Sequence, residues 1–188
     1  IDRCVQDEMA RFDAPGAAVA VILDGELLYE HGYGVTRRGV DDPVDAGTVF
    51  RIGSITKQMT AAAVMQQVEA GRVRLEAPVT EYVPEFQVAG RWSAQKMTVR
   101  HTLTHTAAFP DWIDDYGGTG DTALSDWAAR QGGVSLHAPP GSFWNYSNPN
   151  FMIAGLVAER ASLIEKNELA RSRVEAMITR LKSLEPGT

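Results

Sequence analysis

The sequence has only one cysteine among its 188 residues, Cys4, so no disulfide can form within the chain. Cysteine usage therefore does not identify a cellular compartment, and we expect Cys4 to be a small buried hydrophobic residue rather than a reactive thiol. No apolar run approaches the length that spans a membrane, and Ile1-Asp2-Arg3 does not begin a signal peptide. We thus expect no membrane-spanning segment.

Positive charge is also scarce. The 18 Lys and Arg residues are outnumbered by 24 Asp and Glu residues, which gives a net charge of −6, and no run rich in Lys or Arg occurs. A nucleic acid or an anionic membrane surface is therefore not an expected partner, whereas a small neutral or cationic ligand remains open. With 44% hydrophobic residues, the chain suits one globular domain or a large part of a bigger one.

The most informative stretch runs from Phe50 to Gly71. Apolar Phe50 and Ile52 lead to a glycine, and Ser54 then opens a segment rich in Ala and Met that ends at Gly71. This pattern predicts a strand or turn followed by a helix, with Ser54 at the helix N-terminus, where free N–H groups favour developing negative charge. Lys57 lies three residues on, on the same helical face, so a nucleophile and its base are one interpretation. The other is a helix cap beside a solvated lysine.

The N-terminal part predicts a short amphipathic helix and then a β-hairpin. Apolar residues at helical spacing precede Pro15-Gly16 (Val5, Met9 and Phe12). Residues 17–23 are apolar throughout, Asp24-Gly25 is a strong type I′ turn signal, and residues 26–33 return as a second strand. A first strand with no polar face indicates cover on both sides.

Two histidines invite a metal-site interpretation, because His101 and His105 are four apart and would share a helical face. No glutamate follows His101 in the H-E-x-x-H manner, however, and no third ligand stands nearby. We therefore expect structural or hydrogen-bonding histidines and no metal site.

The second half alternates loops and helices. Residues 79–86 predict a short helix that stops near Pro84, and residues 109–127 predict either a surface excursion that walls a pocket or a loop with Trp112 and Trp127 packed inward. A loop carrying Tyr146 and Asn148 leads into a buried helix over residues 151–160. A separate amphipathic tail helix is predicted from a further apolar stripe, at Val174, Met177, Ile178 and Leu181.

Several of these segments together resemble the serine β-lactamase and penicillin-binding protein family, in particular its branch of class C β-lactamases, D,D-peptidases and related esterases. Ser54-Ile55-Thr56-Lys57 looks like the S-x-x-K element of that family, and Tyr146-Ser147-Asn148 looks like its Y-x-N element. Further matching pieces stand between them at residues 71–79, Leu103-Thr104-His105-Thr106 and Pro140-Gly141-Ser142. Several motifs in the correct order are more specific than any one alone.

The resemblance implies an α/β (α+β) fold of the β-lactamase/transpeptidase type, with an antiparallel sheet flanked by helices plus a helical region. By resemblance, Ser54 is the acylated nucleophile, Lys57 assists its deprotonation and Tyr146 acts as or with the general base and leaving-group acid. Asn148 would hydrogen-bond the substrate. No metal or organic cofactor is implied, and the implied substrates are β-lactams, D-amino-acid peptides or amides, and carboxylic esters. Bacterial members of the family are mostly exported, which implies a periplasmic or secreted protein.

The sequence departs from the family in two ways. The family continues Thr-His-Thr-Ser-Gly, whereas Ala107-Ala108 follows Thr106 here, so we expect a glycine-dependent turn to be altered. The third family element, Lys-Thr-Gly or His-x-Gly on a later strand, is absent after Asn148. Without the C-terminal strands, the hairpin would keep exposed edges and an uncovered apolar face.

These departures shape the expected organisation. Residues 1–162 are interpreted as the N-terminal portion of the family domain, and residues 163–188 as a helical tail that leaves the family pattern. The chain begins with Ile1 instead of Met, so we expect a processed, cleaved or incomplete enzyme. Two alternatives stay open: a non-catalytic binding or assembly module on the same fold, and one chain of a two-chain enzyme whose second polypeptide supplies the missing strands.

Overall fold

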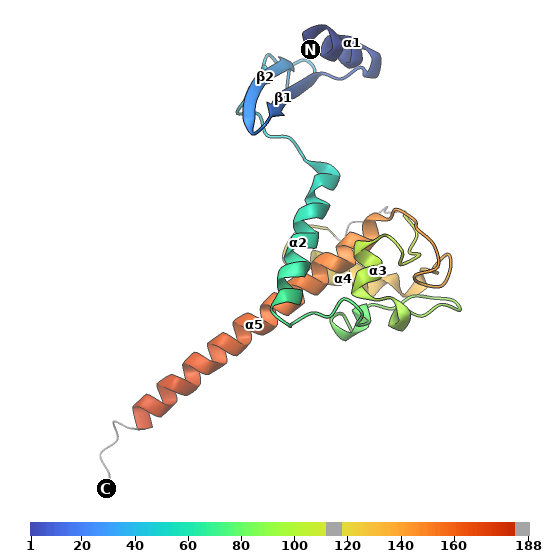
Figure 1. Ribbon diagram of the computed structural model, residues 1–188, viewed down its shortest axis with the longest axis vertical. Coiled ribbons are helices and arrows are strands. Elements are labelled where there is room, and N and C mark those ends of the chain that lie inside the picture. The colour runs from blue at the N-terminus through green and yellow to red at the C-terminus, as the bar shows by residue number, and fades with distance from the viewer. Residues whose placement is uncertain (112–117, 183–188) are drawn as a thin grey trace. The chain divides into compact units, whose positions relative to one another are not determined.

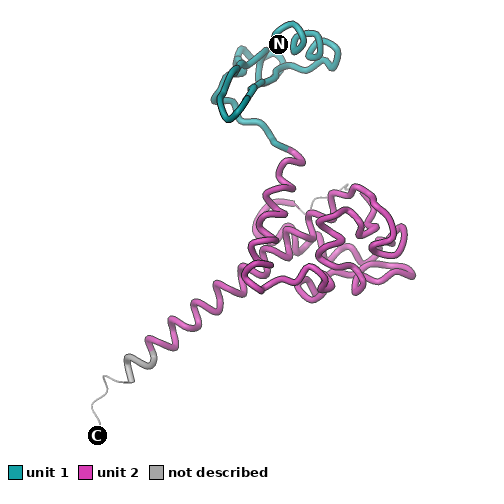
Figure 2. Tube along the Cα trace, viewed as in Figure 1, with its two compact units in different colours: residues 1–52 teal, residues 53–188 magenta. Residues whose placement is uncertain are grey.

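The computed structural model describes residues 1–111 and 118–182, with side chains up to residue 177. It divides into two compact units, Ile1–Ile52 and Gly53–Thr188 (Figure 2). The predictions for Trp112 and for the side chains of Ile178 and Leu181 lie outside the described residues.

The secondary structure mixes helices with one small antiparallel sheet, as the sequence predicts (Figure 1). The elements are α1 Asp2–Phe12, β1 Gly16–Leu23, β2 Glu26–Gly34, α2 Thr56–Glu69, α3 Val99–Leu103, α4 Ala123–Ala129 and α5 Asn148–Lys182. Short 3-10 turns cover Gly53–Ile55, Val79–Glu81, Ala94–Lys96 and Arg130–Gly133. None of the helices in the part of the chain that the structure describes is long and apolar enough to cross a membrane.

Unit 1 consists of α1 and the hairpin of β1 and β2. The hairpin turn has φ values of 52° at Asp24 and 84° at Gly25, which are the two positive angles that a type I′ turn requires. The strands pair antiparallel, with Leu23 opposite Glu26. Tyr33 donates a hydrogen bond of 2.7 Å to the Asp2 carboxylate, which ties β2 to α1. The predicted helix and hairpin are therefore confirmed.

The prediction that the first strand of the hairpin is covered on both faces is wrong within this chain. No side chain of β1 is buried, and Ile22 and Leu23 are 67% and 59% exposed. The reason is that the sheet of the described residues has two strands, each of which pairs only with the other, so the exposed hairpin expected from the missing strands is what is found. Cys4 is likewise exposed and not buried, because α1 buries none of its residues.

Unit 2 holds the hydrophobic core, which is built around the first half of α5. Helices α2, α3 and α4 each pack against α5 (Figure 1). Val64 of α2, Val99 of α3, Trp127 of α4 and Leu156 of α5 are all buried in one cluster. A fully buried side chain of this kind contributes about 1.5–3 kcal/mol, so the cluster fixes the position of the residues at the ends of these helices.

Of the helices predicted for this unit, the one that follows Ser54 and the buried one after Asn148 are confirmed, whereas the short helix over 79–86 and the separate tail helix are wrong. The segment expected as a helix over 79–86 forms only the 3-10 turn Val79–Glu81, although Val83 and Phe86 are fully buried after it. Helix α5 continues for 35 residues without a break across Ser162, so the buried helix and the tail form one element. The division of the chain at Ser162 stays a prediction.

The turn after α3 keeps a left-handed backbone even though it lacks the expected glycine. Ala108 is fully buried and has a φ of 59°, a conformation that costs a residue with a Cβ atom roughly 1–2 kcal/mol. The change to alanine has therefore not removed this feature of the turn.

We expect Ala108→Gly to raise the free energy of unfolding by about 0.5–1 kcal/mol, because relief of this backbone strain exceeds the added entropy of the unfolded chain. Urea denaturation of the polypeptide that carries this chain measures the change. Ala107→Gly is the matched control, since Ala107 is equally buried but has a negative φ, and it should be destabilising. A destabilising Ala108→Gly of similar size to the control would contradict the prediction.

Candidate active site

Ser54 and Lys57 lie at the start of α2. Ser54 belongs to the 3-10 turn Gly53–Ile55, which runs directly into the helix, and Gly53 opens this turn with a φ of 54°. One helical turn on, Lys57 directs its Nζ back so that it donates to Ser54 Oγ at 3.1 Å. The spacing predicted from the sequence therefore brings the amine onto the hydroxyl.

The second pair of predicted site residues comes from the loop that enters α5. The Tyr146 hydroxyl lies 2.8 Å from Ser54 Oγ, across 92 residues of sequence. Asn148 is the first residue of α5, and its Oδ1 accepts a hydrogen bond of 2.6 Å from Lys57 Nζ. The Tyr146 hydroxyl also lies 3.4 Å from this oxygen. The structure thus brings together all four residues predicted for the site, while their chemical roles stay predictions.

Lys57 has the largest effect on the pKa of Tyr146 in this cluster. Hydrogen bonding to Lys57, and secondarily to Ser54, lowers the pKa of the Tyr146 phenol below its ordinary value. Lys57 Nζ also lies 5.0 Å from the centre of the Tyr146 ring and 5.9 Å from that of Phe151. The hydrogen bond from Lys57 favours a phenolate on Tyr146, which is the form that could accept the serine proton.

The imidazole ring of His105 packs against the ring of Tyr146. The two rings stack with their centres 4.5 Å apart and 29° between their planes. The Nδ1 atom of His105 accepts a hydrogen bond of 3.2 Å from the backbone N–H of Ser147. Burial, together with the nearby Lys57 charge, lowers the pKa of the His105 imidazole, so the neutral ring that this acceptor role requires is favoured.

The two histidines do not share a helical face, which corrects the geometry expected from their spacing. Helix α3 ends at Leu103, and His105 follows it with a φ of 57°. His101 accepts a hydrogen bond from the Thr98 N–H and so caps α3, which confirms the structural role expected for it. Among the described residues, no group of three or more metal-binding side chains gathers.

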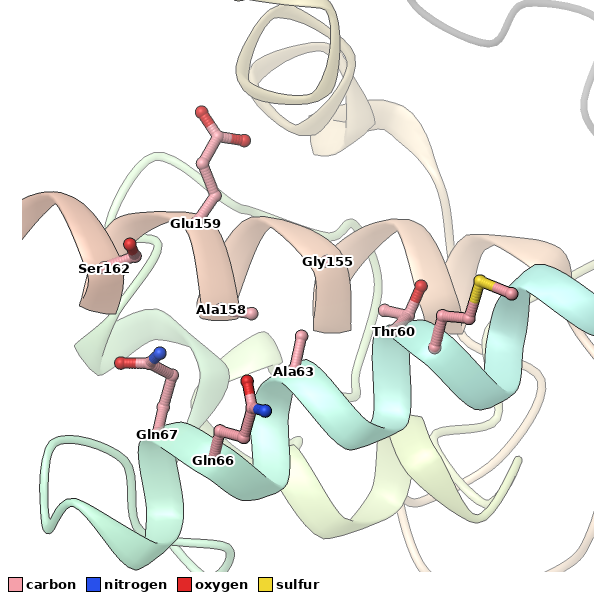
Figure 3. A pocket seen from close by; sticks show the side chains of 9 residues that line it. Thr60, Ala63, Gln66, Gln67, Gly155, Ala158, Glu159 and Ser162 are labelled. Carbon is pink, nitrogen blue, oxygen red and sulfur yellow. The ribbon is translucent and has the colours of Figure 1, made fainter.

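Two grooves lie between helices of unit 2. One has a volume of about 290 Å³ and is lined by Lys57 and Asn148 at one end and by apolar Leu124, Phe151 and Met152 beyond. The other, of about 490 Å³, lies between α2 and α5 and shares Thr60 and Gly155 with the first (Figure 3). Its lining includes Gln66, Gln67, Glu159 and Ser162, and none of the four residues predicted for the site (Figure 3). Of these two grooves, only the first is lined by residues predicted for the site, Lys57 and Asn148.

Asp111 is a residue of the site that the sequence did not single out. It accepts hydrogen bonds from both the backbone N–H and the side-chain amide of Asn148, at 2.7 Å and 3.1 Å. A single aspartate in a loop carries no periodicity and no recognisable spacing to Asn148, so no signal in the sequence could have found it.

Comparison with known proteins identifies the family of the chain. The family model described as Beta-lactamase matches residues 1–182. Penicillin-binding protein 4 of Amycolatopsis lactamdurans is 35% identical over 156 residues, which cover 79% of this chain and 41% of that protein. Esterase EstB of Burkholderia gladioli is 33% identical, with 78% of this chain and 41% of the esterase covered. The chain thus spans about two fifths of the length of these relatives.

Solved structures show the same fold. A class C β-lactamase in complex with cefoxitin superposes with a TM-score of 0.68 and 25% identity, over 85% of this chain and 43% of that enzyme. The octameric penicillin-binding protein homologue from Pyrococcus abyssi gives a TM-score of 0.68 and 26% identity, over 86% of this chain and 38% of the homologue. The fold is therefore of the β-lactamase/transpeptidase type, and the chain belongs to the Beta-lactamase family, whose members include penicillin-binding proteins, esterases and class C β-lactamases.

Proposed function

We propose that this chain carries the nucleophile and the proton-transfer groups of a serine hydrolase that works through an acyl-enzyme on Ser54. The single observation that carries the proposal is the position of Ser54 Oγ, which lies within hydrogen-bond distance of both Lys57 Nζ and the Tyr146 hydroxyl. A nucleophile held by two groups that can exchange its proton is the arrangement that acyl transfer requires.

In the first half of the proposed reaction, the Tyr146 phenolate accepts the hydroxyl proton of Ser54 while Lys57 stabilises the negative charge. Ser54 Oγ then forms a bond to the substrate carbonyl carbon, and the bond to the leaving group breaks as Tyr146 returns the proton to that group. In the second half, water attacks the acyl-enzyme by the same route and releases the acid.

The oxyanion that forms on the carbonyl would be stabilised partly by the Ser54 N–H at the start of α2. A second N–H is expected from the third family element, which this sequence lacks after Asn148. The complete oxyanion hole would therefore need strands from the rest of a longer polypeptide or from a second one.

The proposed substrates are a β-lactam, a D-amino-acid peptide or amide, or a carboxylic ester. The relatives support this range, since they include a penicillin-binding protein, an esterase, and a class C β-lactamase whose structure contains cefoxitin. The apolar lining of the groove beside Lys57 fits an acyl group with an aliphatic or aromatic side chain. Such substrates would meet the enzyme in the periplasm or outside the cell, where family members are found.

A panel assay tests the proposal. The native polypeptide is incubated with nitrocefin, a p-nitrophenyl ester and a D-alanyl peptide, and its intact mass is recorded to show whether a second fragment is present. Turnover of one substrate supports the hydrolase. Stoichiometric acylation or no reaction, in protein that is demonstrably folded, favours the alternative of a binding or assembly module.

A further inference from the structure

The start of α5 is held by a carboxylate from another part of the chain. Asp111 lies in the segment after Phe109-Pro110, and one of its oxygens, Oδ1, accepts both hydrogen bonds from Asn148. The backbone bond satisfies one of the N–H groups that the first turn of a helix leaves free, and the negative charge lies at the positive end of the helix. The side-chain bond has a separate consequence.

That consequence concerns the direction of the Asn148 amide. An asparagine side chain offers an acceptor oxygen on one side and a donor NH₂ group on the other. In this site the carboxylate of Asp111 faces the NH₂ group at 3.1 Å, and the amine of Lys57 faces Oδ1 at 2.6 Å. The reversed amide would place donor against donor and acceptor against acceptor. The two side chains on either side of Asn148 therefore fix its orientation.

The orientation of Asn148 in turn directs Lys57. Lys57 Nζ donates to two acceptors, Asn148 Oδ1 at 2.6 Å and Ser54 Oγ at 3.1 Å. A lysine amine on a flexible four-carbon stem is held in one place only when such acceptors are fixed. The first acceptor is fixed because Asp111 accepts from the other end of the same amide.

We propose that Asp111 is a positioning residue for the reaction at Ser54: it sets the amide of Asn148 so that Asn148 Oδ1 holds Lys57 against the nucleophile. The inference rests on the proposed function, because it assigns a role to Asp111 only through the acylation of Ser54. Asp111 itself touches neither Ser54 nor Lys57 in any hydrogen bond of the described residues.

A double-mutant cycle separates this role from simple support of α5. Asp111→Ala, Asn148→Ala and the double variant are made in the full polypeptide that carries this chain, and the second-order rate constant for labelling of Ser54 by a fluorophosphonate is measured for each. Asn148→Ala keeps the backbone N–H that Asp111 caps and removes only the amide. Any effect of Asp111 on the helix is therefore present in both backgrounds.

We expect Asp111→Ala to lower the labelling rate constant by roughly 10- to 100-fold, the loss seen when partners that orient metal ligands are removed. In the Asn148→Ala background, the same change should alter the rate constant by less than about twofold, since the group through which it acts is gone. Asp111→Asn, which keeps an acceptor oxygen, should fall between the parent and Asp111→Ala. Asp121→Ala removes a negative charge from an exposed residue farther along the chain and should match the parent.

Two results would overturn the proposal: equal losses from Asp111→Ala in both backgrounds, or a rate constant for Asp111→Ala equal to that of the parent. If Asp111→Ala fails to fold by circular dichroism, the cycle is run with Asp111→Asn, and an equal loss in both backgrounds has the same meaning. A parent protein that is folded but unlabelled at Ser54 contradicts the proposed function, and the positioning role falls with it. A labelled parent with an indifferent Asp111 contradicts the positioning role alone.

Discussion

Replacement of Ser54 with alanine is expected to reduce turnover of every accepted substrate to the background rate. The reason is that the acyl bond of the intermediate forms on Ser54 Oγ, and no other hydroxyl nucleophile lies against both Lys57 and Tyr146 in the described residues. In well-studied serine hydrolases, loss of the nucleophile alone costs about 10⁶ in kcat. Steady-state kinetics with the best substrate of the panel measure the loss.

Ser125→Ala is the matched control for this change. Ser125 is another serine of unit 2, on α4, and its hydroxyl donates to the carbonyl of Thr122, the residue that precedes this helix. The control should keep the activity of the parent. Turnover by Ser54→Ala above a few per cent of the parent rate, in folded protein, would show that another group performs the reaction.

Replacement of Tyr146 with phenylalanine is expected to lower kcat/KM by roughly 10²–10⁴, the usual contribution of a positioned general acid or base. Phenylalanine keeps the ring that stacks on His105 and lies below Lys57, so the site should retain its packing. Only the hydroxyl that lies 2.8 Å from Ser54 Oγ is lost. The comparison therefore reports on proton transfer and not on shape.

The role of Tyr146 as a base also predicts the direction in which kcat/KM changes with pH. As a base, Tyr146 acts in its deprotonated form, so kcat/KM should rise as the pH rises through the pKa of its phenol. Because hydrogen bonding to Lys57 lowers this pKa from 10.0, the rise should have its midpoint below pH 10. In Tyr146→Phe, this limb of the pH profile should be absent.

Tyr82→Phe serves as the control, since the Tyr82 hydroxyl is also hydrogen-bonded, as the acceptor from the Arg74 N–H, but lies outside the Ser54 cluster. It should leave both kcat/KM and the pH profile unchanged. An alkaline limb that persists in Tyr146→Phe with the same midpoint would assign the titration to a different group.

The fold could be predicted where local signals are strong. Asp24-Gly25 specifies both positive φ angles of the hairpin turn, and Gly71, with a φ of 72°, ends the segment of α2 as expected. The continuity of α5 was not predicted, because the sequence changes in character near Ser162. Between Gly155 and Pro186 the sequence has neither glycine nor proline, so nothing stops the helix.

Two kinds of signal predicted the four site residues, and each signal identified a different pair. Ser54 and Lys57 are neighbours in the sequence, so helical spacing alone brings them together. Tyr146 lies 92 residues from Ser54 and Asn148 lies 91 residues from Lys57, and only the resemblance of the Y-x-N element suggested them. The contacts of Asp111 with Asn148, and the stacking of His105 on Tyr146, depend on tertiary packing that no local pattern encodes.

Whether the hairpin is buried could not be predicted from the residues of the hairpin alone. An apolar strand indicates burial, but the partners that bury it must be present in the chain, and the described residues supply only one further strand. At the start of α2, Ile55 and Met59 are likewise 56% and 61% exposed although the helix is rich in apolar residues. An apolar composition predicts that a segment can be buried, but it does not identify the partner that buries it.

The most direct test of the central claim is to label the native polypeptide with a fluorophosphonate and locate the adduct by peptide mass mapping. We expect one adduct per chain, on the peptide that contains Ser54, and no adduct in Ser54→Ala. An adduct on another residue, or an unlabelled Ser54 in protein shown to be folded by circular dichroism, would contradict the assignment of Ser54 as the nucleophile.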